Sequence, residues 1–171
     1  MNQRLSQKFF QQDVIKVAPK LLGKVLVRRF ENQTIQKYTI TEVEAYRGKD
    51  DFACHAHKGK TKRTEVMFRE GGLVYVYLIY GIHWLLNIVT GIENDASAIL
   101  IRGIDDISGS GRVGKILQID KSFYGEDLSA SPRIWIEDSG SVIKYKTSPR
   151  VGIYYAGEPW VSKPWRFTII S

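Results

Sequence analysis

The 171-residue chain has one cysteine, Cys54, so an internal disulfide framework is excluded and a reducing compartment is expected. The N-terminal segment MNQRLSQKFFQQ lacks the apolar centre of a secretory signal. The longest apolar stretch, residues 73–90, is broken by tyrosines, a glycine, a histidine and an asparagine, so it does not read as a membrane span. We therefore expect a protein that is not secreted and has no membrane partner.

Acidic residues are in the minority. Asp and Glu number 18 against 25 Lys and Arg, which gives a net charge of +7 and a pI near 9.5. This balance points to a polyanionic partner. The composition, 43% hydrophobic and 25% charged, is that of an ordinary globular protein. The length predicts a single domain over residues 1–171.

Hydrophobic periodicity predicts one helix after an Asp13 cap, with Pro19 expected to kink it or divide it. We also expect strands over 24–30 and 34–46, a hairpin over 73–90 that turns at 80–82, a strand over 98–104, a helix over 111–119, and alternating strand and turn through 151–160 and 163–171. Residues 47–66 read as a long loop. Without a βαβ rhythm, this order predicts an α+β fold, a curved and mostly antiparallel sheet with a few flanking helices.

The stretch ITEVEAYRG, residues 40–48, has an unusual pattern. Strand alternation places Ile40, Glu42, Glu44 and Tyr46 on one side, and the intervening residues on the other. Two carboxylates on a strand most often face solvent.

Several polar clusters allow a functional and an ordinary interpretation. The sequence CHAH at 54–57 lacks the second ligand pair of a zinc site, so we expect no metal. The basic run KGKTKR at 58–63 is either a solvated loop or a phosphate-binding one. Tyr75 and Tyr77 share a strand face and fit core packing, whereas Tyr80 falls at the hairpin tip, where an aromatic ring is easily left projecting.

The motifs E-A-Y, A-x-H, Y-V-Y-x-x-Y-G, L-N-I, L-x-R and Y-A-G-E follow one another in order from about residue 13 to 166. In this order and spacing the chain resembles the alkyladenine (3-methyladenine) DNA glycosylases of the mammalian type. It departs from them at Ser110, where proline is usual, and at His83 and Trp84.

The resemblance implies a base-excision repair enzyme that flips alkylated or deaminated purines out of double-stranded DNA: 3-methyladenine, 7-methylguanine, hypoxanthine and ethenoadenine. It implies hydrolysis of the N-glycosidic bond to an abasic site, without a cofactor, by a protein expected to be a monomer. Such an enzyme would work in the cytoplasm at a bacterial nucleoid, or in a eukaryotic nucleus. The alternatives are a catalytically inactive nucleic-acid-binding domain on the same fold, and a formyl-transferring or RNA-processing enzyme with a related sheet.

The resemblance also implies residue roles. Glu44 would deprotonate the attacking water, and Arg102 and the Val151 carbonyl would help to hold it. Tyr46, His55 and Tyr77 would sandwich the flipped base, and Asn87 would exclude guanine. Tyr80 would be the wedge inserted into DNA. Lys62, Arg63 and Tyr75 would contact the DNA backbone. Glu42 would be a structural neighbour, exposed or paired.

Overall fold

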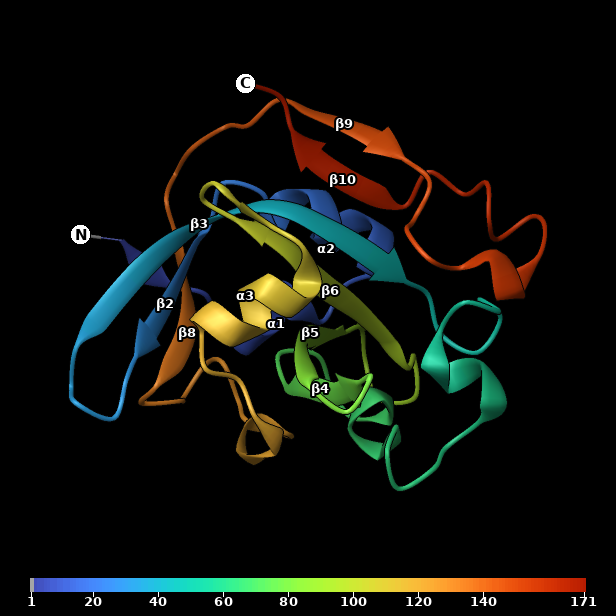
Figure 1. Cartoon of the computed structure of the whole chain (residues 1–171), viewed down its shortest axis with the longest axis horizontal. Coiled ribbons are helices and arrows are strands. Elements are labelled where there is room, and N and C mark those ends of the chain that lie inside the picture. The colour runs from blue at the N-terminus through green and yellow to red at the C-terminus, as the bar shows by residue number, and fades with distance from the viewer. Residues whose placement is uncertain (1) are drawn as a thin grey trace.

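The strands form one open sheet of ten members in the computed structural model, which describes residues 2–171. Their bounds are β1 Gln3–Arg4, β2 Val25–Arg29, β3 Ile35–Tyr46, β4 Val74–Ile79, β5 His83–Thr90, β6 Ser97–Ile104, β7 Ile107–Ser108, β8 Ile134–Asp138, β9 Tyr145–Ser148 and β10 Arg166–Ile169. The main order is β1-β8-β2-β3-β6-β5-β4, and β10 joins β3 to β9. Every pairing is antiparallel, and β3 bends across the molecule (Figure 1). The α+β prediction is confirmed.

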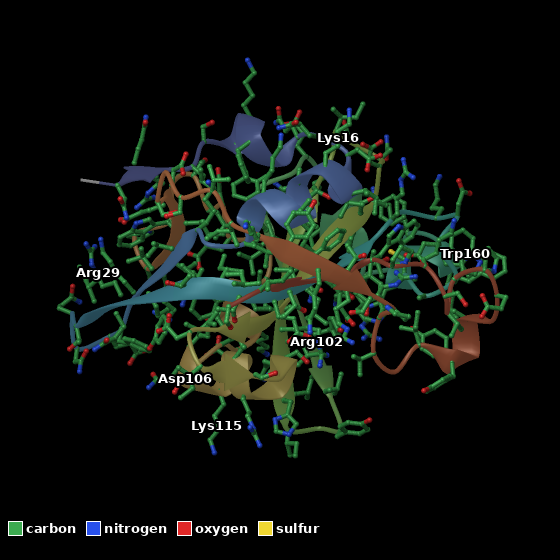
Figure 2. The ribbon with its side chains drawn as sticks, turned by 90° about the horizontal axis from the view of Figure 1, so that it is seen from above. Lys16, Arg29, Arg102, Asp106, Lys115 and Trp160 are labelled. Carbon is green, nitrogen blue, oxygen red and sulfur yellow. The ribbon has the colours of Figure 1, made fainter. Side chains whose placement is uncertain are left out.

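Short helices cover the sheet. They are α1 Gln7–Phe10, α2 Val14–Leu21 and α3 Ser110–Ile116, with 3-10 turns at His55–Lys58, Glu65–Phe68, Lys121–Phe123 and Tyr154–Ala156. The Asp13 carboxylate caps α2 by accepting from the Ile15 N–H at 2.8 Å, as expected, and the helix runs through Pro19 without division. Figures 1 and 2 show α2 and α3 on opposite sides of β3. No helix within residues 2–171 has the length and apolar character to cross a bilayer.

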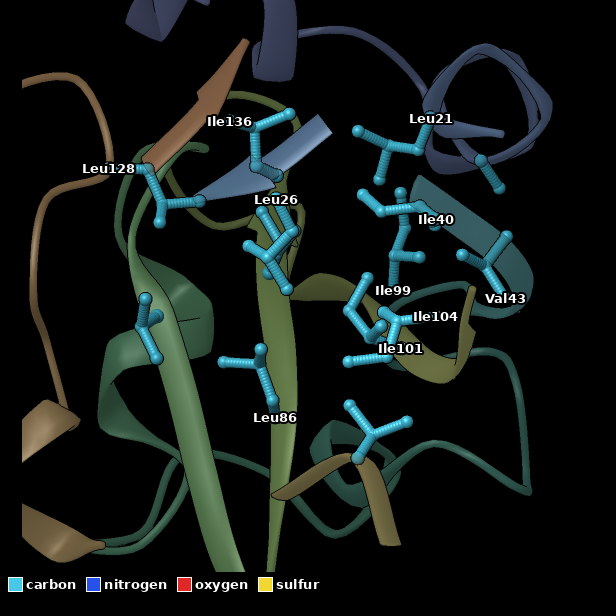
Figure 3. Packing of buried hydrophobic residues seen from close by; sticks show 14 of the residues in the cluster. Leu21, Leu26, Ile40, Val43, Leu86, Ile99, Ile101, Ile104, Leu128 and Ile136 are labelled. Atoms are coloured by element: carbon cyan, nitrogen blue, oxygen red, sulfur yellow. The ribbon is translucent and has the colours of Figure 1, made fainter. Parts of the chain in front are cut away.

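One face of the central strands builds the core. Alternate residues of β3, β6 and β5, among them Val43, Ile101 and Leu86, pack into a single apolar cluster with α2 residues such as Leu21 (Figure 3). The residues between them point to the opposite face, because strand side chains alternate. That opposite face carries the polar residues of the E-A-Y and L-x-R motifs.

The predicted side for Ile40 is wrong. Ile40 is 0% exposed and packs in the core with Val43 (Figure 3). Glu42 and Glu44, on either side of Val43 along the strand, point to the opposite face. The β3–β6 pairing shifts register twice, so that Thr41 on β3 and Arg102 on β6 have no direct partner. Such bulges re-aim the side chains that follow them. The two carboxylates therefore do not share a face with an isoleucine.

The C-terminal region differs in part from the expected alternation. Residues 151–160 contain no strand; they form turns around the 3-10 segment Tyr154–Ala156. Gly152 and Gly157 there have φ of 72° and 66°, which an extended strand does not allow. The strands β8 and β9 were not predicted, although the IWIE sequence of β8 is rich in the β-branched and aromatic residues that favour strands.

Candidate active site

A row of paired residues crosses four strands on the polar face of the sheet. Glu44 on β3 lies opposite Leu100 on β6, Leu100 lies opposite Asn87 on β5, and Asn87 lies opposite Tyr75 on β4. Directly paired residues of antiparallel strands share a face. The register therefore brings together side chains from four distant parts of the sequence.

This row forms the floor of a cavity of about 390 Å³. Nine of the eleven residues that the sequence analysis assigned to a site line it: Glu44, Tyr46, His55, Tyr75, Tyr77, Tyr80, Asn87, Arg102 and Val151. Ser110, at the start of α3, lines it as well, whereas His83 and Trp84 do not. The volume is in the range of sites for small organic ligands.

Glu44 is 0% exposed and is held by two donors. The Tyr46 hydroxyl donates to Oε1 at 2.9 Å, and the Val151 N–H donates to Oε2 at 2.6 Å. Burial raises the pKa of the Glu44 carboxyl, while the Val151 N–H, the charge of Arg102 and the Tyr46 hydroxyl oppose that rise. A carboxylate has about four acceptor sites, so acceptor capacity remains for a water molecule on the cavity side.

Arg102 is bonded to the other carboxylate. Its Nε donates to Glu42 Oε2 at 3.0 Å, and Arg166 approaches the same oxygen at 3.4 Å. Glu42 is paired, as one of the two expectations had it, and does not line the cavity. Arg102 lies beneath β3 near the centre of the view in Figure 2. Its bulge position aims it at the cavity, where its charge acts on Glu44 without a direct hydrogen bond.

The aromatic wall opposite β3 comes from the loop after it and from β4. The rings of His55 and Tyr77 meet edge to face, with centroids 4.5 Å apart. His55 Nδ1 shares a hydrogen bond of 2.8 Å with the Tyr75 hydroxyl. Burial lowers the pKa of His55 to about 4, with Arg63 and Lys58 adding to the effect, so the imidazole is neutral at physiological pH.

The proposed contact of Tyr75 with the DNA backbone does not fit the structure. Its side chain is 1% exposed and packs in a separate apolar cluster with Phe68, Leu73 and Val89, so a phosphate outside the protein cannot reach it in this conformation. Its hydroxyl instead fixes the orientation of the His55 ring. The interpretation of Tyr75 as a packed residue, the ordinary one, is correct.

Tyr80 projects from the tip of the β4–β5 hairpin. It is 88% exposed, and both Tyr80 and Gly81 have positive φ, 51° and 68°, as tight type I′ turns require. The Ile82 N–H closes the turn on the Ile79 carbonyl at 3.1 Å. The hairpin strands thus hold a bare aromatic ring at the mouth of the cavity.

Lys62 and Arg63 are exposed on the 47–66 loop, outside the cavity. The Tyr124 hydroxyl fixes this part of the loop, because it donates to the carbonyls of Lys62 and Arg63 at 3.2 and 2.9 Å. The Arg63 guanidinium lies 5.2 Å from the centroid of the Tyr77 ring. A positive, anchored surface therefore adjoins the aromatic wall.

The CHAH residues are directed to separate partners. His55 contacts Tyr75, His57 Nδ1 bonds the Lys49 carbonyl at 2.9 Å, and Cys54 is buried against Ala96. Within residues 2–171, no three His, Cys, Asp or Glu side chains gather as a metal site would need. Burial raises the pKa of the Cys54 thiol to about 12, which does not favour a nucleophilic thiolate.

Comparison with known proteins shows the family of the chain. The family model for Methylpurine-DNA glycosylase (MPG) matches residues 8–110 and 105–171. The chain belongs to the methylpurine-DNA glycosylase family. Its macromolecular ligand is therefore DNA, and its class of reaction is hydrolysis of N-glycosyl bonds.

Curated relatives of this glycosylase cover nearly the same length. A Natranaerobius thermophilus protein is 38% identical over 190 residues, 97% of this chain and 95% of its own. A Legionella pneumophila protein is 39% identical over 175 residues, 97% and 94%. A Psychrobacter cryohalolentis protein is 38% identical over 186 residues, 92% and 86%. Each is provisionally named a 3-methyladenine DNA glycosylase.

Sequence reasoning missed two residues beside the glycosylase cavity, Asp51 and Arg150. They form an ion pair in which both side chains are 0% exposed. No local signal marks them: Asp51 lies in an irregular loop, and Arg150 follows a Ser-Pro dipeptide 99 positions later. Only the fold brings them together.

Proposed function

We propose that the enzyme flips a damaged purine out of duplex DNA into the cavity and hydrolyses its N-glycosidic bond with a water molecule activated by Glu44. The observation that carries the proposal is a fully buried carboxylate on the floor of an aromatic cavity. The substrates proposed are 3-methyladenine, 7-methylguanine, hypoxanthine and ethenoadenine. A base in the duplex stack must leave it before any such residue can reach its sugar.

The cavity supplies a place for the extruded base. Tyr46, His55 and Tyr77 offer ring faces and edges for stacking, and all three line it. Asn87 is 3% exposed on the floor, where its amide would oppose the exocyclic amino group of guanine. Tyr80 would occupy the space that the nucleotide leaves in the duplex.

The chemistry requires one group that stabilises positive charge on the sugar and accepts a proton from water. As the bond between C1′ and the base nitrogen breaks, its electron pair leaves with the base and the sugar becomes oxocarbenium-like. The Glu44 carboxylate stabilises this charge. It then takes a proton as the water oxygen bonds to C1′, which leaves an abasic site. A cationic methylated purine leaves as the neutral base, whereas a neutral purine leaves as an anion that takes a proton from the solvent.

Three neighbours prepare Glu44 for this role. The Val151 N–H and the Tyr46 hydroxyl fix both carboxylate oxygens, so little reorientation is needed when the base arrives. Arg102 places a positive charge nearby that favours the ionised carboxylate. We also propose that the Val151 carbonyl contacts the attacking water.

The test is incubation with methylated DNA, followed by chromatography of the released bases. We expect free methylated purines and an equal amount of abasic sites from the wild-type enzyme, and none from Glu44→Gln. Borohydride trapping should give no covalent adduct, because a hydrolytic glycosylase forms no Schiff base. DNA binding without base release by the wild type would favour the inactive binding domain instead.

A further inference from the structure

A buried ion pair joins the three segments that build the cavity. The Arg150 guanidinium donates to both oxygens of Asp51, at 2.5 and 3.0 Å, and to the Ala45 carbonyl at 3.0 Å. Asp51 also accepts from the backbone N–H groups of Arg47 and Ala53, at 2.9 and 3.0 Å. The pair thus connects β3, the loop that leads to the aromatic wall, and the segment after Arg150, whose Val151 lines the cavity.

The same guanidinium lies against a cavity residue. Its central carbon is 4.8 Å from the centroid of the Tyr46 ring. Tyr46 lines the cavity and Arg150 does not, so the guanidinium covers the face of the ring that points away from the cavity. Trp165 lies on the guanidinium as well, 5.0 Å from it, and Arg150 is 5% exposed. Water therefore does little to screen this positive charge.

A base stacked on the cavity face of Tyr46 would lie about 3.5 Å beyond the ring. The guanidinium would then be about 8 Å from the base, with one ring between them. At that distance an uncompensated guanidinium repels a purine that carries a positive charge and has little effect on a neutral purine. The Asp51 carboxylate, bonded to the guanidinium through both of its oxygens, cancels most of that repulsion.

We propose that Asp51 determines specificity: by neutralising Arg150 behind Tyr46, it lets the cavity accept positively charged methylated purines as well as neutral ones. The inference rests on the proposed function, because it requires a purine stacked on Tyr46. Asp51 touches no substrate and acts through Arg150. A purely structural role would affect all substrates equally, whereas the charge role affects cationic bases selectively.

The decisive variant is Asp51→Asn, which keeps the size of the side chain and removes its charge. Single-turnover release is measured from two otherwise identical duplexes, one with 7-methylguanine, which is cationic, and one with hypoxanthine, which is neutral. The ratio of the two rates should fall by about two- to thirtyfold, the range for an effective dielectric constant between that of water and about 20. Because the ratio is taken within one preparation, it does not depend on the fraction of enzyme that is folded.

Two further variants sharpen the test. Asp51→Asn combined with Arg150→Gln removes both charges, so the ratio should return to the wild-type value. Asp138→Asn removes an exposed carboxylate that pairs with Lys24 and does not line the cavity, and it should leave the ratio unchanged. An equal loss on both substrates in Asp51→Asn would overturn the inference and leave the proposed function standing. If the wild type released neither 7-methylguanine nor hypoxanthine, both the inference and the proposed function would be overturned.

Discussion

Two glutamates on the same face of β3 should give opposite results when each is changed to glutamine. Glu44 lines the cavity and lies in a site where burial raises its pKa, so removing its charge also removes a desolvation cost. The amide can still accept from the Val151 N–H and donate to the Tyr46 hydroxyl. We therefore expect the free energy of unfolding of Glu44→Gln to lie within about 1 kcal/mol of the wild-type value. Its single-turnover rate of base release should fall at least about 100-fold, the usual contribution of a positioned general base.

Glu42→Gln should have the reverse effect. Glu42 accepts from Arg102 at 3.0 Å and from Arg166 at 3.4 Å, and its side chain is 10% exposed. Loss of the carboxylate leaves two partly buried guanidinium groups with a weaker acceptor, at a cost of about 1–3 kcal/mol. For a chain of this size each kcal/mol lowers the Tm by about 2–4 °C. Base release should decrease far less than in Glu44→Gln.

The assay combines thermal unfolding of both variants with single-turnover release of hypoxanthine under saturating enzyme. DNA binding, measured in parallel, should be nearly unchanged in Glu44→Gln. Equal losses of rate in the two variants would refute the choice of Glu44 as the base. A large loss of stability in Glu44→Gln would refute the account of its burial.

Three other perturbations follow from the same geometry. Tyr80→Ala should slow excision from paired duplex more than from unpaired lesions, without changing the Tm, because the ring is 88% exposed; an unchanged 2-aminopurine flipping signal together with a large fall in Tm would contradict the wedge role. Asn87→Ser should open space for an exocyclic amino group, so guanine release from mismatched duplex should appear, and its absence would remove the steric role. His55 has a pKa of about 4 in the fold and an ordinary value of 6.5, so the unfolded chain binds its proton first as the pH falls. Stability should therefore decrease between about pH 6.5 and pH 4, by at most about 3 kcal/mol, and denaturant titrations of His55→Phe should show a flatter pH dependence.

Local pattern was sufficient for most of the sheet. The hairpin with Tyr80 at its tip follows from two apolar runs around Tyr-Gly, and the alternation within β4, β5 and β6 separates core residues from cavity residues. The side of Ile40 could not be found in this way, because a bulge depends on how two strands pair. Gly103 was the available signal: a Cβ there would lie 2.8 Å from Thr41 Oγ1, and glycine within a strand often marks such a bulge.

The site itself was predictable only through the ordered motifs. No composition or spacing indicates that Glu44, Asn87 and Tyr75 lie in one row, since the register of three strand pairs decides it. The resemblance implied that Tyr75 contacts the DNA backbone, and it gave no information on whether the side chain is buried. The pair of Asp51 and Arg150 joins a loop to a segment 99 residues away, and nothing in either local sequence indicates the contact.

The most direct test of the account is a crystal structure of Glu44→Gln bound to duplex DNA with one hypoxanthine. We predict an intact nucleotide rotated into the cavity, its base between Tyr46 and the ring edges of His55 and Tyr77. The side chain of residue 44 should lie beside a water molecule facing C1′, and Tyr80 should fill the gap in the duplex. A hypoxanthine that remains stacked in the duplex, or that occupies another surface and leaves the cavity empty, would contradict the central claim.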